Sequence, residues 1–411
     1  MIRTRRPSRA ALVALTAGLL VLVGCLAMLW EGSSGAGSSS DDDPDARVRE
    51  LLQPWYAALR DHEQAPVRAV VVGDSISEGV LLPNPVYPRR MVGLLEDELR
   101  RRLDAPEGGA GYFPAFYADP LTADDTVRAG TPPQEVVYGD WGLGGRALVM
   151  PQTSSLTYPA QPGRRIRVGY GGIEALAGEA VVLVDGVDVT AAGRLSDGTP
   201  SGPTISSAST ERRAGLWWES ADLGPGDHVV QVVSTSPAGA FIHTGVEFLD
   251  PDGTSGIHVY DAAHSGATAE SFAREEMENG HWAEVAALDP QLVLVNLGSN
   301  PEPAYRQSLE RVVRLALAAA PHAVVLVVDG YEPGTWDSAA WAVVKQARRD
   351  AVALDPDRVG LLDLASRWPV LAKDGSTNEG LMLESPGPLH LTEAGNARMA
   401  QELAEVLTPP E

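Results

Sequence analysis

The chain has 411 residues, a hydrophobic fraction of 44% and a formal net charge of −23. This length allows two domains with sizeable cores. The acidic balance argues against nucleic acid as a partner, because phosphate binding needs lysines and arginines gathered on one face. The single cysteine, Cys25, excludes an intramolecular disulfide and a thiolate metal site.

Residues 1–30 have the pattern of an export signal. Arginines at the start of the chain precede an uncharged apolar run from Ala10 to Trp30. The run is long enough to span a bilayer, which indicates an uncleaved signal anchor. The sequence Leu-Val-Gly-Cys ending at Cys25 instead resembles a lipoprotein cleavage box, with the lipid on that thiol. Both alternatives place the rest of the chain outside the cytoplasm, attached to the membrane. Residues 31–46 are rich in Gly, Ser and Asp and predict a flexible linker.

Residues 47–107 predict the first part of an α/β domain. Helical spacing over 48–60 is followed by an apolar run at 69–72, which is typical of a strand buried on both faces. The strand leads into Gly73-Asp74-Ser75, and an amphipathic helix is expected over 87–103. Because α/β sheets carry their chemistry at the carboxyl ends of strands, Ser75 is a candidate nucleophile.

Residues 108–256 change in character and predict an inserted β-sandwich domain. Short apolar or alternating runs are separated by Gly, Pro and Asp turns, with strands expected at 180–184, 228–233 and 240–249. Asp185-Gly186 is a strong hairpin signal. The aromatic pair Trp217-Trp218 could line a sugar-binding face, although a place in the core is the favoured interpretation.

After residue 256 the α/β alternation resumes and continues to residue 411. Strands are expected at 257–260, 292–296, 323–328 and 359–363, and helices at 269–288, 304–320, 338–354 and 392–407. This alternation predicts a doubly wound parallel sheet with right-handed crossovers. The simplest organisation is one α/β domain, 47–107 and 257–411, interrupted by the insertion.

A serine nucleophile needs a base, and His390 is the candidate among eight histidines. It comes just before the last predicted helix, which Thr392 can cap, so it sits on a rigid loop. The contexts of the other seven histidines are typical of structural roles.

Four short stretches in order along the chain resemble the motif blocks of the SGNH (GDSL) esterase and lipase superfamily. They are Gly73-Asp74-Ser75-Ile76, His264-Ser265-Gly266-Ala267-Thr268, Gly298-Ser299-Asn300 and Pro388-Leu389-His390-Leu391-Thr392. With its β-rich insertion, the chain is similar to two-domain carbohydrate esterases within that superfamily. The resemblance covers about 65–105 and 257–408 and leaves the insertion unexplained.

The resemblance implies a flavodoxin-like, three-layer α/β/α domain with a parallel sheet. It implies that Ser75 attacks an ester carbonyl, that His390 is the base, and that the N–H groups of Ser75 and Gly266 with the side-chain amide of Asn300 form the oxyanion hole. It implies no metal and no cofactor.

Two positions depart from the superfamily pattern. Pro301 replaces the aspartate that usually ends the third block, and Gly387 replaces the aspartate three residues before the histidine. Another group must then orient the imidazole of His390. Glu384 and Asp374 are candidates, and a main-chain carbonyl near Ser385 or Pro386 is favoured over them.

The sequence therefore predicts an extracytoplasmic serine esterase for small acyl esters, with acetylated carbohydrate as a candidate substrate. Two alternatives stay open: an O-acyltransferase that uses the same serine, and a non-catalytic surface protein that binds glycans. The oligomeric state is not predicted.

Overall fold

The computed structural model describes residues 45–105, 108–118, 127–130, 135–138, 141–174, 177–236, 239–250, 255–300, 302–368, 379–383 and 387–410. The predicted export signal, Cys25 and nearly all of the predicted linker lie outside these residues. In the part of the chain that is described, no helix is long and apolar enough to cross a membrane.

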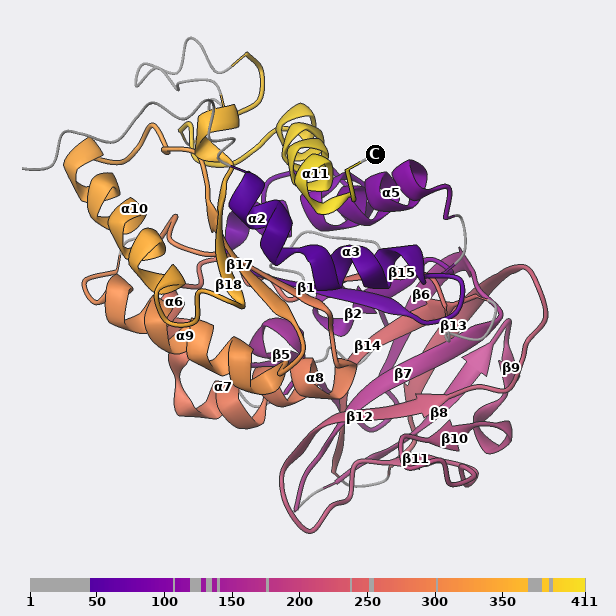
Figure 1. The fold of residues 1–411 in the computed structure, drawn as a ribbon. Helices are drawn as coiled ribbons and strands as arrows, with labels where there is room; N and C mark the ends of the chain where they lie inside the picture. The colour runs from indigo at the N-terminus through magenta and orange to yellow at the C-terminus, as the bar shows by residue number, and fades with distance from the viewer. Residues whose placement is uncertain are drawn as a thin grey trace, which may run out of the picture. The chain divides into compact units, whose positions relative to one another are not determined.

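The centre of the α/β domain is a parallel sheet (Figure 1). Its five strands among the described residues lie in the order β15-β1-β16-β17-β18. Counted along the α/β domain alone, this is the order 2-1-3-4-5 of flavodoxin-like folds, as predicted. The strands are β1 (Val67–Gly73), β15 (Ile257–Asp261), β16 (Leu292–Asn296), β17 (Val324–Asp329) and β18 (Val359–Asp363).

Helices cover both faces of this sheet, because its strands are apolar on both sides. Ala69 and Val71 of β1 pack in the core beneath α2, α3, α5 and α11, whereas Val70 and Val72 face α6 to α10. Three layers result, which confirms the predicted α/β/α architecture. The helices are α2 (Ala46–Leu51), α3 (Gln53–Arg60), α4 (Ser75–Glu78), α5 (Met91–Leu103), α6 (Ala269–Ala273), α7 (Glu275–Asn279), α8 (His281–Leu288), α9 (Tyr305–Ala319), α10 (Ser338–Val352) and α11 (Glu393–Leu407).

Three helices that the spacing predicts as continuous are divided in the structure. The helix over 48–60 breaks at Leu52, between α2 and α3. The helix over 87–103 starts as a 3₁₀ turn, Tyr87–Arg89, because Arg90 is extended. The segment 269–288 forms α6, α7 and α8, because Arg274 is extended and Gly280 leaves the helical region. In each case the apolar spacing continues on both sides of the break, so the periodicity of the sequence does not reveal the break.

The insertion forms two antiparallel sheets that pack face to face, which confirms the predicted sandwich. Asp185 and Gly186 both have positive φ, as the predicted tight hairpin requires. One sheet contains β2 (Gly111–Pro114), β4 (Glu135–Tyr138), β5 (Arg146–Pro151), β7 (Arg165–Gly172), β10 (Arg194–Leu195), β12 (Arg213–Glu219) and β14 (Ala240–Leu249). The other contains β3 (Arg128–Ala129), β6 (Ser155–Pro162), β8 (Glu179–Val184), β9 (Val187–Asp188), β11 (Ile205–Ser206) and β13 (Asp227–Ser234).

Trp217 and Trp218 point to opposite sides of β12, as neighbours on a strand must. Trp218 is fully buried in the sandwich core, and Trp217 is buried against Tyr112 on the side of the α/β domain. Neither ring is presented as a flat exposed platform. The core interpretation of this pair is confirmed.

The insertion packs on the edge strand β15 through buried charged groups. Glu247 of β14 accepts a hydrogen bond from the Tyr260 hydroxyl of β15 and pairs with Arg167 of β7 at 3.2 Å.

On the other side of β15, Glu96 of α5 accepts the Val259 N–H at 2.6 Å. Burial raises the pKa of Glu96 to about 7, although the nearby Arg100 guanidinium opposes the shift.

Glu96 should make the folded protein less stable as the pH rises. Its folded-state pKa of about 7 lies above the ordinary 4.5, so between these values the folded protein holds a proton that the unfolded chain has lost. Stability from this group is therefore present below pH 4.5 and lost as the pH rises through 7. In Glu96→Gln, the fall in Tm between about pH 5 and about pH 8 should be smaller than in wild type.

The matched control is Glu98→Gln on the same helix. Hydrogen bonds from Arg101 and Arg102 lower the pKa of Glu98 to about 2, so its charge does not change in this pH range. Thermal unfolding of this control should keep the wild-type pH dependence. An unchanged pH dependence in Glu96→Gln would contradict the assignment.

Candidate active site

Ser75 and His390 meet at the carboxyl edge of the parallel sheet. The Ser75 Oγ and His390 Nε2 atoms are 3.1 Å apart. Ser75 is the first residue of α4, directly after β1, and is buried, whereas His390 lies on the loop before α11. Thr392 caps α11 by accepting the Gly395 N–H, as expected. The structure thus brings the predicted nucleophile and base within hydrogen-bonding distance.

Asp74, for which the sequence predicts no role, ties the nucleophile turn to a second loop. One carboxylate oxygen accepts the Ile76 N–H at 3.0 Å and so caps α4. The other accepts the N–H and the hydroxyl of Ser299, at 3.2 and 2.5 Å. Burial raises the pKa of Asp74, and the Ser299 hydrogen bonds oppose that rise. Ser299 precedes Asn300, so this one carboxylate links two of the predicted motif blocks.

Gly266 and Asn300 lie on adjacent loops at the same edge of the sheet. The Asn300 side-chain amide donates to the Ala267 carbonyl at 2.8 Å. A primary amide carries two N–H bonds, so this contact fixes the group and leaves a second donor for a ligand. Gly266 has φ +77, and a Cβ there would meet no atom within 4 Å. The space on the side where a Cβ would stand is therefore open, and the backbone has a conformation that favours glycine.

The loop that carries His390 is held through its backbone. The Tyr331 hydroxyl donates to the Leu389 carbonyl at 2.8 Å, and the Leu383 N–H donates to the His390 carbonyl at 2.8 Å. His390 Nδ1 is buried and has no hydrogen-bond partner among the described residues. The candidates Glu384, Ser385, Pro386 and Asp374 all lie outside that part of the chain. Burial lowers the pKa of His390, which favours the neutral imidazole that a base needs.

Glu78 and Arg146 are further residues of this site, and the sequence alone does not predict them. Both side chains are buried, and their charged atoms lie 3.0 Å apart. Glu78 follows Ser75 by three residues, but Arg146 comes from the insertion. No local pattern predicts this contact, because the two residues are brought together only by the packing of the insertion on the α/β domain.

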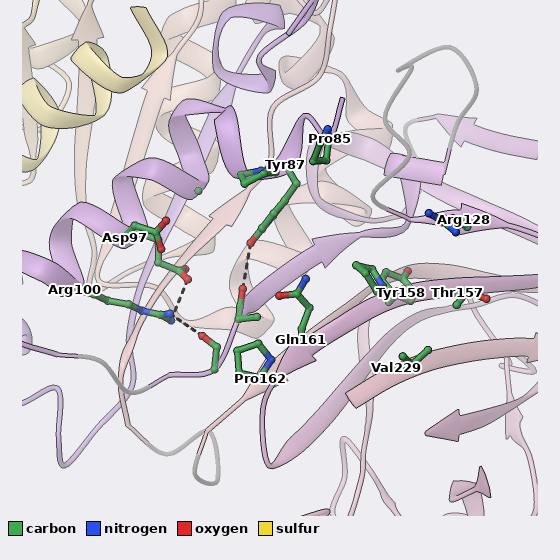
Figure 2. A pocket seen from close by; sticks show the side chains of 16 residues that line it. Pro85, Tyr87, Asp97, Arg100, Arg128, Thr157, Tyr158, Gln161, Pro162 and Val229 are labelled. Carbon is green, nitrogen blue, oxygen red and sulfur yellow. Dashed lines mark hydrogen bonds and ion pairs between the residues drawn. The ribbon is translucent and has the colours of Figure 1, made fainter. Parts of the chain in front are cut away.

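A cavity of about 930 Å³ lies between α5 and the strands β6 and β13 (Figure 2). Tyr87, Asp97 and Arg100 line it from the α/β domain, and Thr157 and Gln161 line it from the insertion. The residues that line it do not include the predicted nucleophile, base or oxyanion donors. The serine and histidine at the sheet edge, not this cavity, define the candidate active site.

A 2-1-3-4-5 parallel sheet with a serine–histidine pair at its carboxyl edge fits the SGNH-type architecture that the sequence predicts. The GDSL-like lipase/acylhydrolase family model matches residues 242–398, which contain Gly266, Asn300 and His390. Ser75 lies before this region, because the insertion separates it from the other motif blocks. This match confirms the predicted likeness to SGNH/GDSL esterases and supports the prediction that the chain is a carboxylic ester hydrolase.

The chain is also similar to solved structures. A peptidoglycan O-acetylesterase aligns over 86% of this chain and 95% of its own, with a TM-score of 0.58 and 16% identity, which establishes a common fold. Family two carbohydrate esterases from Clostridium thermocellum and Cellvibrio japonicus cover 66% and 68% of this chain and 97% and 98% of their own. Their identities are 13% and 12% and their TM-scores 0.30 and 0.26. No curated protein matches the sequence.

Asp74→Asn should weaken both the fold and the site. The amide replaces one acceptor by an N–H group that faces the donors of Ile76 or Ser299, and a buried unsatisfied donor costs about 1–3 kcal/mol. We expect the free energy of unfolding, measured by urea denaturation, to fall by about that amount. Esterase turnover should fall as well, because the loops bearing Ser75 and Asn300 lose their common anchor.

Asp337→Asn is the matched control for this substitution. Asp337 also caps a helix, α10, but is exposed and lies outside the serine–histidine pair. Asparagine is nearly as good a cap as aspartate, so this control should keep near wild-type stability and turnover. Equal effects of the two substitutions would contradict the special role of Asp74.

Proposed function

We propose that this protein is an extracytoplasmic esterase that removes small acyl groups, acetyl above all, from carbohydrate, with Ser75 as nucleophile. The observation that carries the proposal is the 3.1 Å contact between the Ser75 hydroxyl and His390. The esterase class of the chain supports ester hydrolysis. The peptidoglycan O-acetylesterase of the same fold supports acetylated carbohydrate as the substrate class.

In the acylation step, Ser75 Oγ bonds to the ester carbonyl carbon and its proton passes to His390 Nε2. The carbonyl π electrons move onto the oxygen and give a tetrahedral oxyanion. When this intermediate collapses, the bond to the alcohol oxygen breaks, and His390 returns the proton to the departing alcohol. The product of this half-reaction is an ester of Ser75 with the acyl group.

In the deacylation step, water replaces the alcohol. Its oxygen bonds to the acyl carbon while His390 accepts one of its protons. The acyl–Oγ bond then breaks, Ser75 recovers the proton from His390, and the carboxylic acid leaves. The same base thus serves both halves of the reaction.

The oxyanion of each tetrahedral intermediate would accept hydrogen bonds from the N–H groups of Ser75 and Gly266 and from the Asn300 amide. The open surroundings of Gly266 and the fixed Asn300 amide support these roles. A single preorganised donor of this kind is worth about 2.7–4 kcal/mol in the transition state.

His390 must keep its Nε2 atom unprotonated and directed at Ser75. With glycine at 387, we propose that a main-chain carbonyl near Ser385 or Pro386, in preference to the Glu384 carboxylate, accepts the Nδ1 proton. The backbone contacts from Tyr331 and Leu383 support this account, because they fix the loop from which the imidazole projects.

We also propose that residues 1–30 attach the protein to the membrane, by a transmembrane segment or by lipid on Cys25.

Labelling with a fluorophosphonate and turnover of nitrophenyl esters and acetylated glycans test this function together. Wild type should be labelled and should release acetate, and Ser75→Ala should abolish both. His390→Ala should lower kcat by at least about a thousandfold, because the serine loses its base.

His322→Ala is the matched control, since His322 is exposed in the turn before β17. It should keep wild-type turnover. Folded wild type that is neither labelled nor active would contradict the catalytic proposal and favour a glycan-binding protein. Transfer of the acyl group to an added sugar in preference to water would show an acyltransferase instead.

A further inference from the structure

Glu78 connects the nucleophile helix to the loop that carries Gly266. It is the last residue of α4 and is buried. One of its carboxylate oxygens accepts the N–H of Ser265, the residue before Gly266. The other pairs with the Arg146 guanidinium at 3.0 Å. Burial opposes the charge on Glu78, but the charge and hydrogen bond of Arg146, with weaker contributions from Arg90 and His264, together lower the pKa of this carboxyl.

Arg146 makes a second contact with the same loop. It is the first residue of β5 in the insertion, and its Nη2 donates to the Ala263 carbonyl at 2.6 Å. Its guanidinium also lies over the Phe116 ring, 3.5 Å from the ring centre. A planar guanidinium can hold a carboxylate and a carbonyl at fixed directions at the same time, which a lysine cannot do.

Other groups of the insertion support the same segment, residues 261–265. The Tyr117 hydroxyl donates to the Asp261 carboxylate at 2.6 Å, and the other oxygen of Asp261 accepts the Ala263 N–H. His264 Nδ1 lies 2.9 Å from the carbonyl of Gly144. A Cβ at Gly144 would come within 2.8 Å of the Ala263 carbonyl, so the two backbones are in close contact.

This support matters because Gly266 cannot hold its own position. It is exposed and has no side chain to pack, and its φ lies in the left-handed region. An oxyanion donor must lie about 2.7–3.1 Å from the developing charge. The position of the Gly266 N–H therefore depends on its neighbours, and those neighbours are held by the insertion.

We propose that Arg146 and Glu78 are positioning residues of the oxyanion hole, and that the β-rich insertion is thereby a working part of the catalytic centre. The inference rests on the proposed function, since it assigns a purpose to the oxyanion hole of that reaction. The insertion acts even on a substrate too small to touch it, because its effect passes through the 261–266 loop.

Kinetics on 4-nitrophenyl acetate separate this role from simple stabilisation of the fold. Arg146→Gln and Glu78→Gln should lower kcat by about a hundredfold and change KM by less than about threefold. The reason is that a misplaced Gly266 N–H weakens a hydrogen bond to the oxyanion, which forms only in the transition state. Arg146→Lys should recover part of kcat, since it restores the charge but not the fork. The double variant should lose no more than the worse single variant, because the two residues act as one unit.

A second readout is the affinity for methylboronic acid, which forms a tetrahedral anionic adduct with a nucleophilic serine. It should weaken in parallel with kcat/KM in each variant. Arg164→Gln is the matched control within the insertion: it breaks an exposed pair with Asp222 and should leave kcat and boronate affinity unchanged. Thermal unfolding identifies an assay temperature at which every variant is folded. If Arg146→Gln does not fold, Arg146→Lys and Glu78→Gln are used for the test instead.

If the folded variants kept the wild-type kcat and boronate affinity, this inference would be overturned and the proposed function would stand. A wild-type protein without turnover that depends on Ser75 would overturn the proposed function, and the inference with it.

Discussion

Strand β1 lies between β15 and β16, and the rest of the site depends on this pairing. Val71 is in register with Asp261 on one side and with Leu294 on the other. Parallel pairing places the carboxyl ends of the three strands at one edge of the sheet, although the whole insertion separates β1 from β15 in the sequence. Ser75, the 261–266 loop and the 298–300 loop follow these three ends. Their proximity is a consequence of the register.

Two carboxylates then fix the loops relative to the serine. Asp74 and Glu78 lie on either side of Ser75, at the two ends of α4. Asp74 binds the loop that carries Asn300, and Glu78 binds the loop that carries Gly266. A buried carboxylate is costly unless it is paired and hydrogen-bonded, and here those partners are the segments that a serine hydrolase must hold still. The desolvation of two charges is thus offset by contacts that also organise the site.

Much of this arrangement can be predicted from the sequence. The sheet and its layers are specified by the apolar runs of β1, β16 and β17 and by the spacing of α9, α10 and α11. The order of the motif blocks predicts that Ser75 and His390 meet. The breaks at Leu52, Arg90 and Gly280 are not predicted, because one residue that departs from the helical region does not disturb the apolar spacing. The roles of Arg146 and Glu78 are not predicted for a different reason: in the sequence each resembles an ordinary surface charge, and only the packing of the insertion brings them together. Glu384, one of the groups proposed to orient His390, lies outside the described residues.

The most direct test of the account is to trap the acyl-enzyme. The protein would be mixed with an activated acetyl ester, quenched with acid during turnover, digested and mapped by mass spectrometry. The account predicts an acetyl group on the peptide that contains Ser75, on the serine itself, and its accumulation if deacylation is slow. Steady turnover with no acetylated Ser75, or with the acetyl group on a different residue whose substitution abolishes activity, would contradict it.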